Sequence, residues 1–443
     1  MKTIASSRIV ALAGVALMFC AALTACGSQP PSAASLHTAH VSVGELLYVV
    51  DGAASPGGGG TASQDIVAFH PGGSATSPVV TLPMGLTTQD HQRLYATTSA
   101  AGHTTITVYD TRVGTRLSVF TITGMYTMDG RGYAGAVLSP DGKWLVLRQL
   151  VPAAGSSAFA LVDTQARKLA QTVVLAGDFD LDAVSPGGTM LYLLQNLNDV
   201  AHHYYVRAYD LTARALLETI IVDKTALDET KMTGTAVTRQ MAPDGSIAYT
   251  LYIDPAHNRA FVHILPLGDG PNSAPFARCV DLPAGASSDL LHLYTLALSP
   301  DGTTLYAANA ALGTVSAISL HGQEVFNDEV IATGHFAPAS GGAASSDIAR
   351  ILYNGAALST DGQMLYVTGV RGILAIRTSD LRLMNTYAVG HAFTGVILSA
   401  NGESLYAAGP ASGIIAISLS GNGTSRQLRV PVRSPWGIAW VSA

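Results

Sequence analysis

Short apolar runs alternate with polar turns along most of the chain, and one combination of the two recurs. A small apolar run is followed by Ser-Pro-Asp-Gly or a variant of it, and then by Leu-Tyr or a related pair and another apolar run. Proline fixes the first corner of a turn, while Asp or Asn followed by Gly supplies the left-handed backbone of a tight hairpin. Each copy therefore predicts two antiparallel strands joined by a tight turn. The copies occupy residues 88–95, 138–145, 184–192, 241–249, 298–306, 358–366 and 398–406.

The spacing of the copies indicates the architecture. From Asp90 to Asn401 there are six intervals of about 52 residues, which fits four short strands and their loops, as in one blade of a β-propeller. A second pair of strands is visible in the better copies, for example at 105–110 with 116–122. The first strand of each repeat carries small residues such as Ala183 and Ala297, because bulky side chains would collide where blades converge on the axis.

The two ends of the chain complete the pattern. Residues 46–50 match the second strand of a repeat without its first strand, and residues 434–440 match a first strand without its followers. We expect these ends to share one blade, with the C-terminal strand innermost and three N-terminal strands outside it, because this closure removes free sheet edges. The sequence thus predicts an all-β propeller of about eight four-stranded blades. Seven blades is the alternative if one repeat is degenerate or displaced.

The repeats carry a family resemblance over roughly residues 46–443. The segments Leu-Tyr-Ala-Ala-Asn at 305–309 and Gly-Thr-Val-Ser-Ala-Ile at 313–318, together with the Ser-Pro-Asp-Gly turns, resemble YVTN-type repeats of lactonase-like and WD40-like β-propellers. Relatives in that broad group include surface-layer proteins, lactonase-like propellers and the propeller parts of some redox enzymes. The resemblance implies an architecture and leaves the function open.

The first residues predict export and lipid anchoring. Lys2 and Arg8 precede an apolar stretch at 9–22 that is too short to span a bilayer comfortably. Leu23-Thr24-Ala25-Cys26 then resembles the lipobox of bacterial lipoproteins, in which the cysteine is acylated and becomes the first mature residue. A plain secretory peptide or an uncleaved anchor is the alternative.

These features predict three parts of the chain. They are a signal peptide at 1–25, a flexible tether with lipidated Cys26 at 26–43, and a single propeller domain at 44–443. Two or three acyl chains hold a protein firmly to a bilayer, so we expect a lipoprotein on the extracytoplasmic face of the cell membrane.

Composition narrows the range of partners. The chain has 24 basic and 30 acidic residues, a formal net charge of −6, and loss of residues 1–25 would make it −8, so nucleic acid is not expected as a partner. Of the three cysteines, Cys20 would leave with the signal peptide and Cys26 would carry lipid. Cys279 is then alone, no disulfide is expected, and we expect it to be a small buried side chain.

The sequence lacks several signatures of enzymes. It has no Gly-x-Ser-x-Gly, no His-Glu-x-x-His, no Cys-x-x-Cys-His and no phosphate-binding loop. We therefore expect a monomeric binding or scaffolding module for a protein or glycan partner, with no cofactor predicted. The alternative is a lactonase-like or lyase-like, metal-assisted enzyme that uses the channel mouth.

Candidate binding residues lie in the connections between one blade and the next, because these connections gather on one face around the channel mouth. His335 and His391 each follow a glycine at matching points, so they could converge with Asp180 or Asp347 on a divalent metal, although solvated loop residues are the plainer interpretation. Trp436 could stack on a ligand or pack in the closing blade. The candidates are Asp129, Arg131, Asp180, Lys231, His292, His335, Asp347, Arg350, His391, Arg433 and Trp436.

Overall fold

A computed structural model describes most of the chain after residue 43. The described residues are 44–52, 65–72, 77–128, 135–199, 202–223, 231–270, 276–285, 287–322, 324–337, 354–369, 371–420, 423–430 and 432–442. The helices among them are three short 3₁₀ turns, η1 (Pro255–His257), η2 (Ser288–Leu293) and η3 (Val325–Asn327). None of these described helices has the length and apolar character needed to cross a bilayer.

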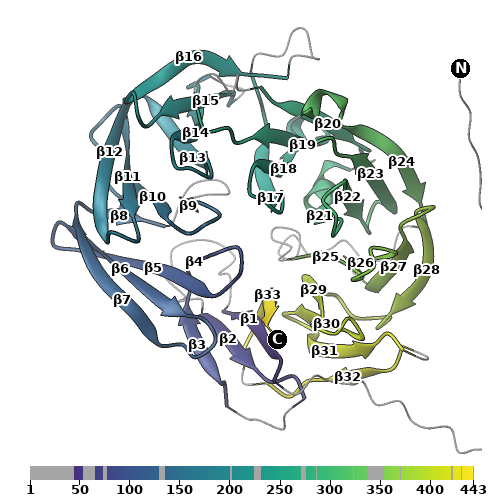
Figure 1. The fold of residues 1–443 in the computed structure, drawn as a ribbon. Coiled ribbons are helices and arrows are strands. Elements are labelled where there is room, and N and C mark those ends of the chain that lie inside the picture. The colour runs from purple at the N-terminus through teal and green to yellow at the C-terminus, as the bar shows by residue number, and fades with distance from the viewer. Residues whose placement is uncertain are drawn as a thin grey trace, which may run out of the picture. The chain divides into compact units, whose positions relative to one another are not determined.

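The described strands form eight antiparallel sheets that stand around a central axis as the blades of a propeller (Figure 1). The prediction of about eight blades is confirmed, and the seven-blade alternative is wrong. In six of these sheets, consecutive strands pair with one another from the axis to the rim. The other two differ, because one has five strands and one joins the two ends of the chain. Small residues do lie in the innermost strands, at the positions predicted from the repeat, including Ala183 and Ala297.

The first four blades in chain order extend from residue 86 to residue 282. Blade 1 consists of β4 (Leu86–Thr87), β5 (Arg93–Ala100), β6 (His103–Asp110) and β7 (Arg116–Thr123). Blade 2 consists of β8 (Tyr126–Thr127) and β9 (Ala136–Leu138), which both pair with β10 (Trp144–Gln149), followed by β11 (Ser156–Asp163) and β12 (Lys168–Ala176). Blade 3 consists of β13 (Asp178–Val184), β14 (Met190–Asn196), β15 (Tyr204–Asp210) and β16 (Ala215–Ile221). Blade 4 consists of β17 (Thr235–Met241), β18 (Ile247–Asp254), β19 (Arg259–Pro266) and β20 (Arg278–Leu282).

The other four blades include the one that closes the ring. Blade 5 consists of β21 (Thr295–Leu298), β22 (Thr304–Asn309), β23 (Thr314–Ser319) and β24 (Glu329–His335). Blade 6 consists of β25 (Ala356–Leu358), β26 (Met364–Gly369), β27 (Gly372–Arg377) and β28 (Arg382–Tyr387), and blade 7 of β29 (Gly395–Leu398), β30 (Ser404–Gly409), β31 (Gly413–Ser418) and β32 (Ser425–Gln427). Blade 8 joins the two ends of the chain in the order β3 (Val80–Pro83), β2 (Asp65–Phe69), β1 (Leu46–Asp51) and β33 (Pro435–Ser442).

The recurring turn owes its shape to hydrogen bonds made by its own side chains. In blade 2, Ser139 Oγ donates to Asp141 Oδ1 (2.6 Å), and the backbone N of Lys143 donates to the same carboxylate (3.0 Å). The backbone N of Trp144 then donates to Ser139 Oγ (2.9 Å), so the turn passes directly into β10. Gly142 has a φ of +71°, which glycine adopts without steric cost. The local sequence is therefore sufficient to form the turn.

Neighbouring blades are joined by apolar contacts and by tyrosines. Eight hydrophobic clusters are found among the described residues, and each combines the facing sides of two adjacent blades. The tyrosine of the Leu-Tyr pair reaches across this interface. Tyr95 Oη donates to the carbonyl of Gly142 in the next blade (3.2 Å), and Tyr192 Oη donates to the carbonyl of Gly268 (3.1 Å). These contacts explain why tyrosine recurs at this position of the repeat.

Blade 8 closes as predicted, with β33 innermost and paired with β1. Glu45, which immediately precedes β1, connects this blade to blade 7. Its buried carboxylate accepts hydrogen bonds from the backbone N of Ala400 (2.7 Å) and from Tyr406 Oη (2.9 Å). Trp440 of β33 stacks on Tyr48 of β1, with 4.3 Å between ring centroids. No pattern in the sequence indicated this role of Glu45.

The antiparallel order of the strands gives the ring two different faces. The turn between the first and second strands of each blade lies on one face, together with the turn between the third and fourth strands; we call this the turn face. The connections between the second and third strands lie on the opposite face, together with those that lead to the next blade; we call this the loop face. The candidate residues predicted from the sequence belong mainly to the loop face.

Glu45 makes the stability of the ring depend on pH. Burial raises the pKa of this carboxyl above its ordinary value, and the hydrogen bonds from Ala400 and Tyr406 offset part of that rise. The folded protein therefore holds the proton to a higher pH than the unfolded chain, whose glutamate pKa is about 4.3. The favourable contribution of the protonated group is complete below that pH and is lost as the pH rises through the folded-state pKa.

We therefore expect Glu45→Gln to gain stability relative to the wild-type protein as the pH rises from about 4 towards neutrality. Urea unfolding of both proteins at several pH values measures this difference. Glu403→Gln, the same substitution at an exposed position of the blade 7 turn, controls for the change in net charge. If the difference in the free energy of unfolding between wild type and Glu45→Gln stays constant over this pH range, the raised pKa of Glu45 is contradicted.

Candidate binding site on the loop face

Five of the residues predicted to have functional roles lie outside the described residues: Cys26, Asp129, Arg131, Asp347 and Arg350. The other seven are Asp180, Lys231, His292, His335, His391, Arg433 and Trp436. They come from different blades and have different surroundings.

Asp180 is engaged by a neighbouring blade. Its carboxylate on β13 forms an ion pair with Arg148 of β10 and also accepts a hydrogen bond from Asn196 Nδ2 (2.8 Å). Arg148 additionally lies 3.7 Å from the carboxylate of Asp178. A carboxylate held in this way connects blades 2 and 3 near the axis.

A second ion pair lies between blades 3 and 4, two residues along β13 from Asp180. The sequence did not indicate this pair. Arg239 of β17 pairs with Asp182 of β13 and donates a hydrogen bond to the Asp182 carbonyl (2.6 Å). The Asp182 side chain is buried, and that of Arg239 is 9% exposed. Arg239 Nε also donates to Thr250 Oγ1 (2.8 Å). His263, which lies opposite Thr250 in the sheet, is 1% exposed, and burial lowers its pKa to about 4. This neutral histidine and the ion pair form a polar row inside an otherwise apolar interface.

The two histidines considered as metal ligands have exposed surroundings. His335 is the last residue of β24, and His391 lies between β28 and β29 with its ring 6.1 Å from that of Phe393. Over the described ranges, no three His, Cys, Asp or Glu side chains are arranged so as to hold a metal ion. Because Asp347 is outside those ranges, the proposed metal set stays a prediction.

The remaining three candidates occupy separate places. His292 lies in η2 and is half-buried. Trp436 is half-buried in β33, and its carbonyl accepts a hydrogen bond from Thr394 Oγ1. Arg433 is exposed, and its backbone N donates to Asp51 Oδ1 (3.0 Å). It lines a cavity of about 500 Å³ beside β31 and β32, together with Pro410, Gln427 and Val432.

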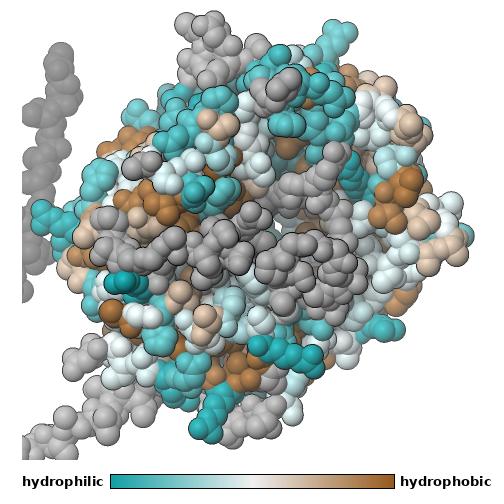
Figure 2. Space-filling view, turned by 180° about the vertical axis from the view of Figure 1, so that it is seen from behind, coloured by the Kyte–Doolittle hydropathy of each residue, from teal (hydrophilic) through white to brown (hydrophobic). Residues whose placement is uncertain are grey.

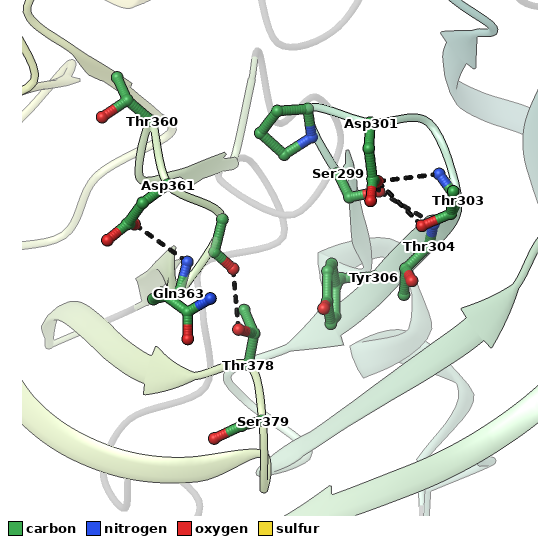
Figure 3. Close-up of a pocket in the computed structure, with 12 residues that line it drawn as sticks. Ser299, Asp301, Thr303, Thr304, Tyr306, Thr360, Asp361, Gln363, Thr378 and Ser379 are labelled. Carbon is green, nitrogen blue, oxygen red and sulfur yellow. Dashed lines mark hydrogen bonds between the residues drawn. The ribbon is translucent and has the colours of Figure 1, made fainter. Parts of the chain in front are cut away.

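A further cavity lies on the turn face between blades 5 and 6 (Figure 3). Tyr306 lies between two copies of the recurring turn, one containing Asp301 and the other Asp361. Ser299 Oγ and Thr303 N both donate to Asp301, at 2.6 and 3.0 Å, and Thr378 Oγ1 donates to the carbonyl of Gly362 (2.8 Å). These groups stabilise the turns, and equivalent bonds occur in other blades. We therefore attribute this cavity to the repeat architecture.

The cleft between blades 3 and 4 on the loop face has a richer set of side chains. It has a volume of about 260 Å³ and contains Lys231, one of the predicted candidates. Figure 2 shows hydrophilic residues gathered along the top of the molecule, where Figure 1 places β15, β16, β19 and β20 of these two blades. The residues that line it are His203, Lys231, Met232, Thr233, Asp254, His257, Arg259, Phe261 and Cys279.

Two histidine–carboxylate pairs stand at the entrance of this cleft. His203 Nδ1 lies 2.7 Å from Asp199 Oδ2, and Lys231 Nζ lies 3.9 Å from the same oxygen. His257 Nδ1 lies 2.6 Å from Asp254 Oδ2. These contacts hold both imidazoles in fixed positions at the edge of the cleft.

Asp254 is the buried member of this group. Burial raises the pKa of its carboxyl, but hydrogen bonds from Thr233 and His257 outweigh that effect and keep the pKa below its ordinary value. The group is therefore ionised at neutral pH. It fixes Thr233, which follows the chain segment from blade 3, against the β18–β19 hairpin of blade 4.

The inner wall of the cleft comes from the outer strands of blade 4. Arg259 Nε lies 2.8 Å from Asp281 Oδ1, and its guanidinium stacks over the ring of Phe261 at 4.9 Å from the centroid. Cys279 lies deeper, opposite His263 in the sheet, and makes no disulfide. It was expected to be a small buried side chain, whereas it is half-buried and lines the cleft.

Sequence reasoning found Lys231 but not its neighbours. His203 belongs to an adjacent His-His pair with no distinctive motif, and Asp254, Arg259 and Cys279 come from three different strands. Their proximity depends on the register of blade 4 and on its contact with blade 3. The sequence feature that indicated this site was the position of Lys231 in a connection between two blades.

The protein is similar in fold to several solved structures. No family model and no curated protein matches the sequence. Among solved structures, a candidate 6-phosphogluconolactonase of Bacteroides fragilis is 16% identical, with 90% of this chain and 98% of that chain covered and a TM-score of 0.47. A periplasmic gluconolactonase of Pseudomonas aeruginosa is 17% identical, with coverage of 79% and 98% and a TM-score of 0.43. The C-terminal WD40 domain of Sif2 is 9% identical, with coverage of 85% and 97% and a TM-score of 0.43.

Two arginines of blade 4, Arg239 and Arg259, each form an ion pair with an aspartate, but we expect their replacement to change the free energy of unfolding by very different amounts. Arg239→Ala leaves the buried carboxylate of Asp182 without its cationic partner, so we expect a loss of about 3–5 kcal/mol in the free energy of unfolding. Arg259→Ala removes a solvent-exposed ion pair with Asp281, and we expect a loss of about 1 kcal/mol or less. Urea unfolding followed by tryptophan fluorescence measures both. Equal losses in the two variants would show that the Asp182–Arg239 pair does not stabilise the interface between blades.

Proposed function

We propose that this protein is a lipid-anchored propeller on the extracytoplasmic face of the cell membrane, and that it binds a protein or glycan partner through its loop face. The proposed anchor is Cys26, within the lipobox-like sequence Leu23-Thr24-Ala25-Cys26. The proposed binding residues are those of the cleft between blades 3 and 4, with Lys231 and Arg259 as its two permanent cations.

The observation that carries the binding proposal is the mutual pairing of polar groups around this cleft. His203, His257 and Arg259 are each held by a carboxylate, so their positions are fixed before a ligand arrives. Binding to such groups requires little ordering of side chains, which lowers the entropic cost of association. The same groups offer both donors and acceptors of hydrogen bonds, as a polar partner needs.

The size of the cleft favours a large partner over a small ligand. Sites for small molecules have volumes of about 300–1,000 Å³ and enclose most of the ligand. At about 260 Å³, this cleft fits one protruding element of a larger molecule, such as a side chain of a protein loop or a single unit of a glycan. The surrounding loop face would supply the rest of the contact.

Hydrolysis of an ester or lactone is the second candidate function. The observation in its favour is the His257–Asp254 pair, because an imidazole oriented by a carboxylate is a common arrangement for a general base. In that case the cleft, rather than the channel mouth, would be the catalytic site.

The anchor is tested with Cys26→Ala. Wild-type protein expressed in a bacterium should incorporate labelled palmitate and sediment with membranes, because the cysteine thiol accepts the lipid. Cys26→Ala should incorporate no label and should appear in the soluble fraction. Membrane association of the variant to the wild-type extent would refute acylation of Cys26 as the anchor.

The binding site is tested by retention of envelope components on the immobilised, full-length protein. We expect the double variant Lys231→Ala/Arg259→Ala to retain a protein or glycan partner at least tenfold more weakly than wild type, because the cleft loses both permanent cations. Lys143→Ala/Arg377→Ala removes two positive charges from the turn face and should retain the partner normally. If no partner is retained and the purified ring hydrolyses a small lactone or aryl ester, the enzymatic alternative replaces this proposal.

A further inference from the structure

The point at which the chain enters the ring is fixed by contacts of Glu45. This residue immediately precedes β1, and its carboxylate accepts a hydrogen bond from the backbone N of Ala400, in the recurring turn of blade 7 (2.7 Å). Its carbonyl also lies 2.8 Å from His70 Nδ1. The register between β1 and β33 supports the same position. Leu46, the first residue of β1, lies opposite Ser442, the last residue of β33. The chain therefore joins the ring on the turn face.

The cleft lies on the opposite face. His203 and His257 belong to connections between the second and third strands of blades 3 and 4, and Lys231 belongs to the connection between these blades. Both types of connection lie on the loop face. The entry point of the chain and the candidate binding site are thus separated by the full height of the blades, which is about 20–30 Å for strands of six to nine residues.

The length of chain between Cys26 and the ring limits how the ring can turn. Seventeen residues lie between Cys26 and Gly44, and the eighteen residue steps from one to the other span at most about 65 Å at full extension. To bring the loop face to the membrane, this segment would have to pass outward across β2 and β3 and then along the height of the blade. That route takes more than half of the extended length, and holding a chain so stretched costs conformational entropy.

We propose that the turn face is the membrane-side face of this protein and that the loop face is presented away from the membrane. This inference rests on the proposed acylation of Cys26. The kind of partner that fits is a protein or glycan that approaches from the space beyond the membrane surface. A lipid headgroup of the anchoring membrane does not fit, because it lies on the other side of the ring.

The test uses the full-length, acylated protein in vesicles that contain a lipid with a fluorescent acceptor on its headgroup. A donor dye is attached to a single introduced cysteine in a Cys279→Ser background, either at Gln363→Cys on the turn face or at Lys231→Cys on the loop face. Both native residues are exposed. We expect energy transfer to be at least twofold stronger from residue 363 than from residue 231, because the blade height separates the two positions.

Two controls distinguish the ways in which this proposal can fail. Insertion of about 40 Gly and Ser residues between residues 27 and 43 should reduce the difference between the labels, because a longer chain permits either face to approach the membrane. Equal transfer from both labels with the native length, or stronger transfer from residue 231, would overturn the orientation alone. Absence of transfer from both labels, as expected for Cys26→Ala, would overturn the lipid anchor together with the orientation.

Discussion

The pairing of β33 with β1 closes the ring of blades. Each blade is stabilised by apolar contact with the blade on either side, so a ring with a missing or open blade loses two of these interfaces and exposes sheet edges. The closing pair joins strands from opposite ends of the chain, and it is reinforced by Trp440 stacked on Tyr48 and by the bonds of Glu45 to blade 7. It also places the entry of the chain on the turn face, opposite the cleft between blades 3 and 4.

The fold could be predicted from the sequence because its determinants are local. A turn such as Ser139-Pro-Asp141-Gly142 forms from hydrogen bonds within five residues, and the same arrangement recurs at a regular spacing. The small residues of the inner strands and the unpaired strands at both ends then indicated a closed ring. The contribution of Glu45 could not be predicted, because its two partners are 355 and 361 residues away along the chain. A single acidic residue before a strand has no pattern that would indicate such contacts.

The candidate site could be predicted in part. Lys231 was found because it lies in a connection between blades, and loop position is visible in a sequence. Its neighbours could not be found, because the register between β18, β19 and β20 decides which of their side chains face blade 3. Asp180 shows the opposite problem. It was predicted to lie in a connecting segment and to be available for a ligand, but it lies in β13 and is held by Arg148, 32 residues earlier, in the preceding blade. Contacts between blades decide which polar residues remain accessible to a partner, and they follow from tertiary packing.

We propose that a partner binds the loop face at the cleft between blades 3 and 4. Photo-crosslinking in living cells tests it most directly, with a benzophenone amino acid placed at residue 231 in the cleft or at residue 363 on the turn face. We expect position 231 to crosslink to a defined envelope protein or glycan and position 363 to give no such product. A defined crosslinked product from position 363, with none from position 231, would contradict it.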